Sequence, residues 1–407
     1  MEEIALSLTG LAYGGEAIGR DQSGRMIFVP FALPGERVLV QVVETHKRWA
    51  RARLLEVRER SSDRIDPRCS HFTLCGGCHY QHMPYPAQLR AKKDIVRDQL
   101  ARIGGFDDPP VAASVPSPSP WQYRNHMRFS LTPQGKLGFV TADSDRVFAV
   151  GECHLPEPPL ADLWPRIELE SISGLTHVGL RAGAKDEQLL ILHGEGDPEV
   201  EVHIELPASV VWLGPGGAAV LGGEGFLEIE VLGRTFRVSA GSFFQVNTTL
   251  AGELVQRALQ ALEMQAGELV FDLYAGVGLF SAALAAAGAR VVAVEESQWA
   301  CADFEVNLDE FDDVALYEAA VEQALPAIKE KPAAVLVDPP RAGLSREVLD
   351  LLVKAGPERL VYVSCDLATL ARDGKRLAAA GYTLEVLTPI DLFPQTYHIE
   401  TISRWRR

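Results

Sequence analysis

From residue 248 to about residue 380, strand-like apolar runs alternate with helix-like segments, and this pattern restricts the possible folds of the chain more than any other feature. The strand-like runs are LVFDLY, RVVAVE, AVLVDPP and RLVYVSC, and the segments FSAALAAAG, REVLDLLVKAG and ATLARDGKRLAAAG have helical spacing. Such alternation predicts an α/β fold with a parallel, doubly wound, Rossmann-like sheet. The final stretch, YTLEVLTPIDLFPQTYHIETISRW, carries two strand patterns and no long helix, which predicts an antiparallel pair at the sheet edge.

The rest of the chain is rich in strand patterns. Residues 1–60 hold five short β-type runs separated by Gly and Pro, which is typical of a small OB-type β-barrel. Residues 61–108 combine a cysteine-rich stretch with a helix predicted over 85–104. The pattern of residues 109–240 predicts a mostly antiparallel, β-rich domain, and residues 241–407 contain the predicted α/β domain. A chain of 407 residues is long enough for about two to three domains besides such a linking segment.

Composition narrows the class of protein. No apolar run reaches the roughly 18 residues of a membrane helix, and the acidic start MEEIALSLTG is unlike a secretory signal. Six cysteines are too few for a disulfide scaffold of this length. We therefore expect a soluble, cytoplasmic protein without a membrane partner, acting as a monomer.

The net charge of −16 by itself disfavours a polyanionic partner, because phosphate binding depends on Lys and Arg. Basic residues are nevertheless crowded between positions 47 and 60. The simplest interpretation of such a run is a solvated face, and the alternative is a patch that binds nucleic acid.

The first chemical motif is the strand–turn–helix FDLYAGVGLFSAALAAAG. Asp272 ends a strand, and Gly276 and Gly278 allow the backbone to approach a ligand at the start of a helix. Glu295 ends the next strand, where a carboxylate can accept hydrogen bonds from ribose hydroxyls. Ser281 stands where a dinucleotide-binding motif has its third glycine, which favours S-adenosylmethionine over a dinucleotide. The alternative is a purely structural turn.

Two further strand ends carry reactive side chains. In VLVDPPR, Asp338 falls at the carboxyl edge of the sheet, where such folds bind ligands, although Asp-Pro-Pro is also a good strand terminator. In RLVYVSCDLATLARD, Cys365 lies between a strand and a helix, where a thiol can have a depressed pKa and act as a nucleophile. Most free cysteines are inert core residues, and we assign Cys301 to that class.

Four other cysteines have the spacing of a metal site. Cys69, Cys75 and Cys78 lie within ten residues, and Cys153 follows at a distance. Four thiolates suit an iron–sulfur cluster or zinc. Nearby histidines such as His79 could also be zinc ligands, so a zinc site is an alternative. The spacing alone does not decide the metal.

Near the C-terminus, FPQTYHIETISRW contains His398 and Glu400. Period-2 alternation predicts both on one strand face, opposite Ile399. A buried carboxylate at a strand end is a candidate general base; the alternative is a surface acid on an edge strand.

Taken in order, these motifs resemble the RNA uracil-5-methyltransferases, which make 5-methyluridine in tRNA and 23S ribosomal RNA. The resemblance covers nearly the whole chain and rests on SFFQVN, DLYAGVGLF, VDPPRAG, YVSC with TLARD, and FPQTYHIET. The N-terminal barrel is similar to a TRAM domain. The cysteines, with Cys153 in VGECHL, are similar to the 4Fe–4S site of the ribosomal RNA branch.

The resemblance implies a role for each matching residue. Cys365 would be the nucleophile and Glu400 the general base in S-adenosylmethionine-dependent methylation of uracil C5, with 23S ribosomal RNA as the substrate and tRNA as the alternative. The cofactor would be bound by Gln245, Tyr274, Glu295 and Asp338, and a 4Fe–4S cluster by Cys69, Cys75, Cys78 and Cys153. One departure is Asp366-Leu367 where the family usually has Asn-Pro; an added carboxylate should raise the pKa of the adjacent thiol.

The chemistry fits these residue types. Thiolate attack at C6 makes C5 nucleophilic, and the target base must leave the stack to be reached. Phe243 and Phe244 could stack on that base, or be ordinary core aromatics. Because the net charge of the whole chain is negative, we expect the RNA to bind along a narrow basic track that includes residues 47–60. Two other hypotheses remain: a methyltransferase for adenine or cytosine, and an iron–sulfur RNA-binding protein with an inactive transferase domain.

Overall fold

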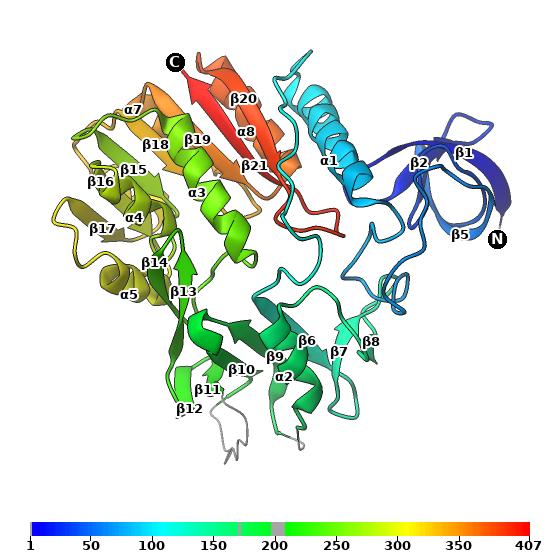
Figure 1. Cartoon of the computed structure of the whole chain (residues 1–407). Coiled ribbons are helices and arrows are strands. Elements are labelled where there is room, and N and C mark those ends of the chain that lie inside the picture. The colour runs from blue at the N-terminus through cyan, green and yellow to red at the C-terminus, as the bar shows by residue number, and fades with distance from the viewer. Residues whose placement is uncertain (1, 170–171, 197–207) are drawn as a thin grey trace.

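The computed structural model of the chain describes residues 2–169, 172–196 and 208–407. Three β-structures follow one another along the sequence: a small barrel, a central sheet and a large C-terminal sheet flanked by helices (Figure 1). In the part of the chain described, no helix has the length and apolar character needed to cross a membrane.

The N-terminal barrel is closed, with strand order β1-β2-β3-β5-β4. Its strands are β1 (Glu3–Leu11), β2 (Ala17–Arg20), β3 (Met26–Val29), β4 (Arg37–Thr45) and β5 (Trp49–Glu59). Alternate side chains such as Leu6, Ile27 and Val40 point inward and form the barrel's own core. Closure leaves no unpaired edge, and the predicted five-stranded barrel is confirmed.

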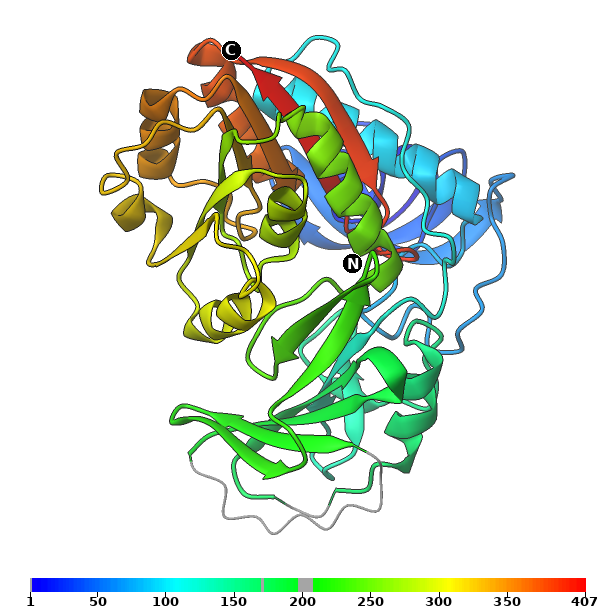
Figure 2. The ribbon, with the colours of Figure 1, turned by 60° about the vertical axis from the view of Figure 1, so that its left-hand side comes forward.

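A long helix, α1 (Tyr85–Gln99), follows the cysteine-rich segment and continues as a π-helical turn, η1 (Leu100–Gly104), that ends at Gly105 with φ 76°. Ile95, Val96 and Leu100 pack into the hydrophobic core of the C-terminal domain. The helix therefore packs with the C-terminal sheet, although it precedes the central sheet in the sequence (Figure 2).

The central sheet has seven strands in the order β12-β11-β10-β9-β6-β7-β8. All neighbours pair antiparallel except β10 and β11, which agrees with the mostly antiparallel prediction. The strands are β6 (His126–Leu131), β7 (Leu137–Val140), β8 (Val147–Ala149), β9 (Leu175–Ala182), β10 (Gln188–Gly194), β11 (Ser209–Gly214) and β12 (Gly217–Gly222), with short helical turns α2 (Pro158–Leu163), η2 (Trp164–Arg166) and η3 (Ala184–Asp186).

A two-stranded ribbon, β13 (Phe226–Val231) and β14 (Arg234–Ser239), leads into the C-terminal domain. The strands of that domain are β15 (Leu269–Leu273), β16 (Arg290–Glu295), β17 (Val314–Glu318), β18 (Ala334–Val337), β19 (Arg359–Ser364), β20 (Thr383–Ile390) and β21 (Glu400–Arg406). Their order is β17-β16-β15-β18-β19-β21-β20, and the first five are parallel. Strand β21 runs antiparallel between β19 and β20, so the predicted antiparallel pair at the edge is confirmed.

Helices cover both faces of this sheet, as the alternation predicted. They are α3 (Thr248–Leu262), α4 (Leu279–Ala286), α5 (Gln298–Asn307), α6 (Val321–Ala324), α7 (Arg346–Ala355) and α8 (Leu367–Ala379). Residues of α3, α4 and α5 share one hydrophobic core, and residues of α1, α6, α7 and α8 share the other. The carboxyl ends of the parallel strands are thereby left at a common edge.

Candidate active site

The candidate residues converge because of strand direction. Asp338 and Cys365 directly follow β18 and β19, and Glu295 ends β16, so all three lie at the carboxyl edge of the parallel strands. Strand β21 runs the other way and begins at Glu400, at the same edge. Thr401 pairs with Ser364 in the register, which brings Glu400 beside Cys365.

The turn after β15 is shaped for a ligand. Tyr274 has φ 66° and Gly276 has φ 57°, a left-handed conformation that glycine adopts without strain. A Cβ added at Gly276 would meet nothing within 4 Å, whereas one at Gly278 would lie 2.2 Å from Leu308. Gly276 therefore offers open backbone to a ligand, and Gly278 is required for packing against α5 and the turn that follows it.

Glu295 organises this turn. Its carboxylate accepts the backbone N–H groups of Gly276 at 2.8 Å and of Ser297 at 2.8 Å. The side chain is only partly buried, so a nucleoside can still reach it. The donor set around the turn fits S-adenosylmethionine, with a carboxylate for ribose hydroxyls and open backbone at Gly276.

Asp272, beneath the turn, is fully buried. The Ser281 hydroxyl donates to its Oδ2 at 2.6 Å, while Oδ1 has no partner among the described residues. Burial raises the pKa of Asp272 to about 7. Ser281 thus replaces the third glycine of a dinucleotide motif with a hydroxyl that holds this carboxyl group.

Three carboxyl groups and one thiol share the site. Burial and neighbouring Asp272 raise the pKa of Asp338 to about 7, and burial together with Asp338 raises the pKa of Glu400 well above its usual range. Glu400 is 3% exposed, and its Oε1 lacks a hydrogen-bond partner in the described part of the chain. A buried carboxyl group of this kind, with an oxygen that has no partner among the described residues, is suited to proton transfer.

The prediction that Cys365 has a depressed pKa is wrong for this state of the protein. Burial, Glu400 and Asp338 raise the pKa of its thiol to about 12, and Arg341 opposes them. The adjacent Asp366 is turned away to cap α8: it accepts the Thr369 N–H at 2.9 Å and the Tyr13 hydroxyl at 3.0 Å.

Arg341, which follows the Asp-Pro-Pro turn, was missed by sequence reasoning. Its charge lowers the pKa of both Cys365 and Glu400. Its guanidinium lies 3.4 Å from Nδ1 of His398. The arginine was visible in VDPPR, but nothing in the pattern indicated that it faces the thiol.

The predicted pairing of His398 and Glu400 on one strand face is also wrong, because β21 begins only at Glu400. His398 lies in the preceding loop, and burial and Arg341 lower its pKa to about 3. Ile399, between them in sequence, is buried.

Three candidate residues in the segment before α3 differ in their exposure to solvent. Gln245 is buried, and its backbone carbonyl accepts the Asn125 amide at 3.0 Å. Phe243 is 70% exposed, whereas Phe244 is 5% exposed and packs in the core. Only Phe243 is therefore available to stack on a base.

The cysteines far from this edge gather at a second place. Cys69, Cys75, Cys78 and Cys153 all line one cavity of about 540 Å³ between the cysteine-rich segment and the central sheet. Burial raises the pKa of all four thiols, to about 12 for Cys78 and about 11 for Cys153. However, within the described residues no three His, Cys, Asp or Glu side chains are arranged to hold a metal ion. The thiol donor set fits a cluster in chemistry, but the structure does not bear out the metal site. Cys301 is buried in α5, as expected of a core thiol.

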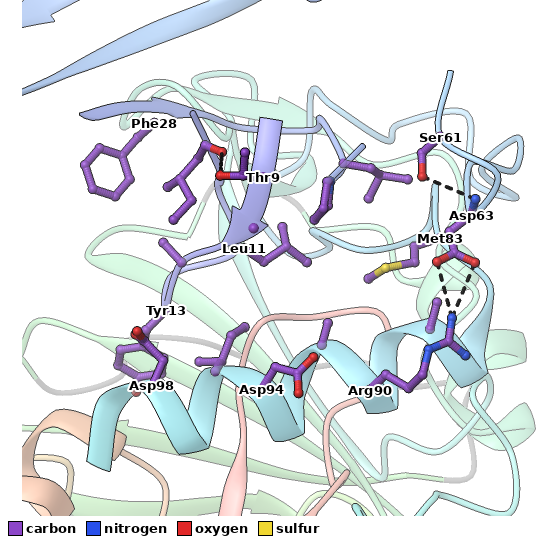
Figure 3. Close-up of a pocket in the computed structure, with 18 of the residues that line it drawn as sticks. Thr9, Leu11, Tyr13, Phe28, Ser61, Asp63, Met83, Arg90, Asp94 and Asp98 are labelled. Carbon is purple, nitrogen blue, oxygen red and sulfur yellow. Dashed lines mark hydrogen bonds and ion pairs between the residues drawn. The ribbon is translucent and has the colours of Figure 1, made fainter. Parts of the chain in front are cut away.

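A further cavity of about 710 Å³ lies between the barrel and α1. Figure 3 shows Asp94 of α1 below the strand that carries Leu11, and Arg90 paired with Asp63. None of the candidate catalytic, cofactor or cysteine residues lines this cavity.

Three exposed arginines in the basic run of the barrel form ion pairs. Arg51 lies 3.5 Å from Glu16, Arg58 lies 3.4 Å from Glu56, and Arg60 lies 3.8 Å from Asp66. The simpler interpretation of residues 47–60 as a solvated face therefore accounts for this part of the run, and the predicted basic track is not supported there.

The solved structure of the Pyrococcus abyssi tRNA (uracil-54, C5)-methyltransferase in complex with S-adenosyl-L-homocysteine has this fold: the TM-score is 0.75 at 24% sequence identity, covering 99% of this chain and 100% of that one. The fold is that of the S-adenosylmethionine-dependent methyltransferases.

Sequence comparisons narrow the class. The tRNA (uracil-5-)-methyltransferase family model matches residues 225–403, and the TRAM domain model matches residues 2–55. An uncharacterized RNA methyltransferase of Gloeobacter violaceus is 32% identical over 100% of this chain and 97% of its own length. An uncharacterized RNA methyltransferase of Aquifex aeolicus is 35% identical over 98% of this chain and 97% of its own length. The chain belongs to the RNA uracil-5-methyltransferase family.

Proposed function

We propose that the protein methylates C5 of a specific uridine in RNA, with Cys365 as the nucleophile and Glu400 as the general base. The observation that carries the proposal is the register of β19 and β21. It sets a thiol and a buried carboxyl group with an unpartnered oxygen side by side, at the edge that also carries the cofactor turn. Transfer to an exocyclic amine of adenine or cytosine would need no covalent cysteine.

The chemistry assigns one role to each group. The thiolate of Cys365 bonds to C6 of uracil, and the electron pair of the C5–C6 double bond moves to give an enolate with density at C5. S-adenosylmethionine would supply the methyl group that C5 takes up, and its S–CH3 bond would break to leave S-adenosylhomocysteine. Glu400 then removes the C5 proton, the double bond re-forms, and the thiolate leaves. The charge of Arg341 favours the ionised forms of both groups that must lose a proton.

For the cofactor, we propose contacts from Gln245, Tyr274, Glu295 and Asp338. Glu295 ends β16 and Asp338 follows β18, the two strands that flank β15, and Tyr274 begins the open turn at Gly276 after β15. We also propose that Phe243, exposed two residues before Gln245, stacks on the flipped base.

For the substrate, we propose 23S ribosomal RNA, on the resemblance of the four cysteines to the ribosomal RNA branch. The second candidate is tRNA, favoured by the overall likeness to the Pyrococcus abyssi tRNA enzyme. In either case we assign residues 1–60 and 109–240 to RNA binding, 61–108 to the cysteine segment and linking helix, and 241–407 to catalysis, in the cytoplasm.

For the four cysteines, we propose a 4Fe–4S cluster with a structural role. Their thiols face one cavity from two segments that are far apart in sequence, so a shared cluster would fasten the cysteine segment to the central sheet. No redox step is required by methyl transfer, and no step above depends on the cluster.

The deciding experiment supplies methyl-labelled S-adenosylmethionine with unmodified 23S ribosomal RNA and, separately, bulk tRNA, followed by digestion to nucleosides. Label in 5-methyluridine from ribosomal RNA is the expected result. Label only in tRNA would keep the chemistry and replace the substrate. Label in another nucleoside, or none in either RNA, would overturn the proposed reaction.

A Cys365→Ala variant tests the mechanism. We expect loss of methyl transfer with RNA and S-adenosylmethionine binding retained. Cys301→Ala is the matched control and should keep methyl transfer, because this thiol is buried in α5 and donates to the backbone carbonyl of Glu295 at 3.5 Å, not to a reacting group. Unchanged methylation by Cys365→Ala would rule out the covalent route.

A further inference from the structure

One face of the central sheet carries a group of cationic and imidazole side chains. The strand register places Arg128 opposite Gly179, and His193 opposite His177. His126 lies two residues before Arg128 on the same face of β6, and Arg124 lies two residues before the start of that strand. We call Arg124, His126, Arg128, His177 and His193 the arginine–histidine track.

The track lies on the side of the sheet that meets the catalytic domain. Ile191, on the same face, packs into the core shared with α3 and α4. Side chains of the opposite face, such as Phe129 and Val178, form a separate core with α2. Ligands bound to the track would therefore lie between the central sheet and the catalytic domain.

The imidazoles converge above a residue that has no side chain. A Cβ added at Gly179 would lie 3.4 Å from Nε2 of His193 and 3.6 Å from Nε2 of His126. His126 Nε2 and His177 Nδ1 are buried and have no hydrogen-bond partner among the described residues. Polar atoms buried in this way are normally satisfied, so these point to a missing partner.

The arginines of the track lack counter-charges. Within the described ranges no ion pair joins Arg124 or Arg128 to a carboxylate, in contrast to Arg51, Arg58 and Arg60 of the barrel. No carboxylate is among the groups that shift the pKa values of the three histidines; burial and the neighbouring cations lower all three. In a protein of net charge −16, an uncompensated cationic surface indicates an anionic ligand.

The track also reaches the catalytic edge. Arg124 is close enough to His398 to contribute to the lowering of its pKa, and Arg341 lies 3.4 Å from the same imidazole. Arg124, His126 and Arg128 also line the cavity that contains the four cysteines. A line of cations thus runs from Arg341, beside Cys365, along β6.

We propose that the arginine–histidine track binds successive phosphates of the RNA strand that flanks the methylated uridine. This inference rests on the proposed function for the identity of the polyanion. The arginines supply the charge, and the unpartnered imidazole nitrogens supply hydrogen bonds to phosphate or ribose oxygens. The track replaces the barrel run at 47–60 as the basic path across an acidic protein.

The test measures the affinity of the full-length protein for a short uridine-containing single-stranded RNA over a series of salt concentrations. The variants are Arg124→Gln and Arg128→Gln. The matched control is Arg290→Gln, an exposed arginine paired with Glu330 at the opposite end of the catalytic strands. Each track variant should bind RNA about tenfold more weakly at low salt. Its plot of log affinity against log salt should be less steep by about one.

S-adenosylmethionine binding should be unchanged in all three variants, which separates a lost phosphate contact from misfolding. RNA affinity and salt slope equal to those of the unaltered protein in both track variants would overturn the track, even if methylation of uridine is found. Weakened RNA binding by the track variants with no uridine methylation by the unaltered protein would support the track and reject the proposed function. Absence of RNA binding by the unaltered protein would reject both.

Discussion

Nζ of Lys92 lies 2.5 Å from Oδ1 of Asp391, an ion pair in which both side chains are 1% exposed. The same ammonium group donates to the carbonyls of Phe393 at 3.0 Å and His398 at 2.8 Å. All three of its donors are thereby used. Helix α1 thus holds both ends of the loop between β20 and β21, and that loop ends at Glu400.

We predict that Lys92 positions Glu400. Lys92→Met alone should cost about 3–5 kcal/mol of stability, because it leaves Asp391 buried and unpaired. The double variant Lys92→Met/Asp391→Leu should recover most of that loss. Its kcat should nevertheless remain reduced about tenfold to a hundredfold, with the KM for S-adenosylmethionine unchanged, because the loop carbonyls lose their donor.

The matched control is Arg359→Met/Glu268→Leu. Arg359 is also buried, pairs with Glu268 at 2.7 Å and donates to two backbone carbonyls, but at the opposite edge of the same sheet. Its double variant should keep its kcat. Equal losses of kcat in both double variants would reduce Lys92 to a general stabilising role.

We predict that Arg341 sets the pH range of the reaction. Glu400 acts as a base only when ionised, so activity is present above its raised pKa and is lost as the pH falls through it. In Arg341→Gln a favourable positive charge is removed, and the pKa values of Glu400 and Cys365 both rise. The acidic limb of the rate profile should therefore move upward by about one pH unit.

Single-turnover methyl transfer measured across the pH range reports this limb. Arg346→Gln on α7 serves as the control, because this arginine is exposed and pairs only with Asp350. A downward shift, or an equal shift in the control, would contradict the assignment of Arg341 to the thiol and carboxyl groups.

We predict that Asp366 has little influence on the thiol beside it. Its carboxylate caps α8 through Thr369 and accepts the hydroxyl of Tyr13 from the barrel, and the charges that raise the pKa of Cys365 most are those of Glu400 and Asp338. Asp366→Asn should leave the pH dependence of Cys365 alkylation nearly unchanged. Asp338→Asn should lower the pH at which the thiol reacts, and the reverse order would show that the adjacent residue controls it.

The sequence predicted the features that depend on periodicity and strand ends. Alternating apolar runs indicated the doubly wound sheet, and Asp338, Cys365 and Glu400 each stand where a strand begins or ends, so topology alone brings them together. Two strands were not singled out. Strand β12 is glycine-rich, and β17 is an edge strand with largely exposed side chains, so neither has the apolar pattern of a buried strand.

Electrostatic features were the least predictable. The depressed pKa of Cys365 was inferred from a helix start, but burial and two carboxyl groups from other strands outweigh that effect. The basic run at 47–60 stood out in the sequence, yet in the fold Arg51 pairs with Glu16 from the segment before β2, and Arg58 pairs with Glu56 of its own strand. Arg124 and Arg128 stand out only in three dimensions, because their lack of counter-charges is a property of the folded surface.

The four-cysteine cavity leads to a prediction about metal content. Protein purified without oxygen should contain iron and acid-labile sulfide in equal amounts, because the proposed 4Fe–4S cluster holds both. Zinc without sulfide would identify the alternative metal, and neither metal would reject the site. Cys78→Ser should abolish the bound metal and lower the thermal stability, since Cys78 is the most buried of the four, whereas Cys301→Ser should keep the metal.

A structural role for the cluster further requires that the metal-free protein, if it remains folded, binds RNA more weakly but still binds S-adenosylmethionine. Loss of methyl transfer with RNA binding intact would instead assign the cluster a part in the reaction itself.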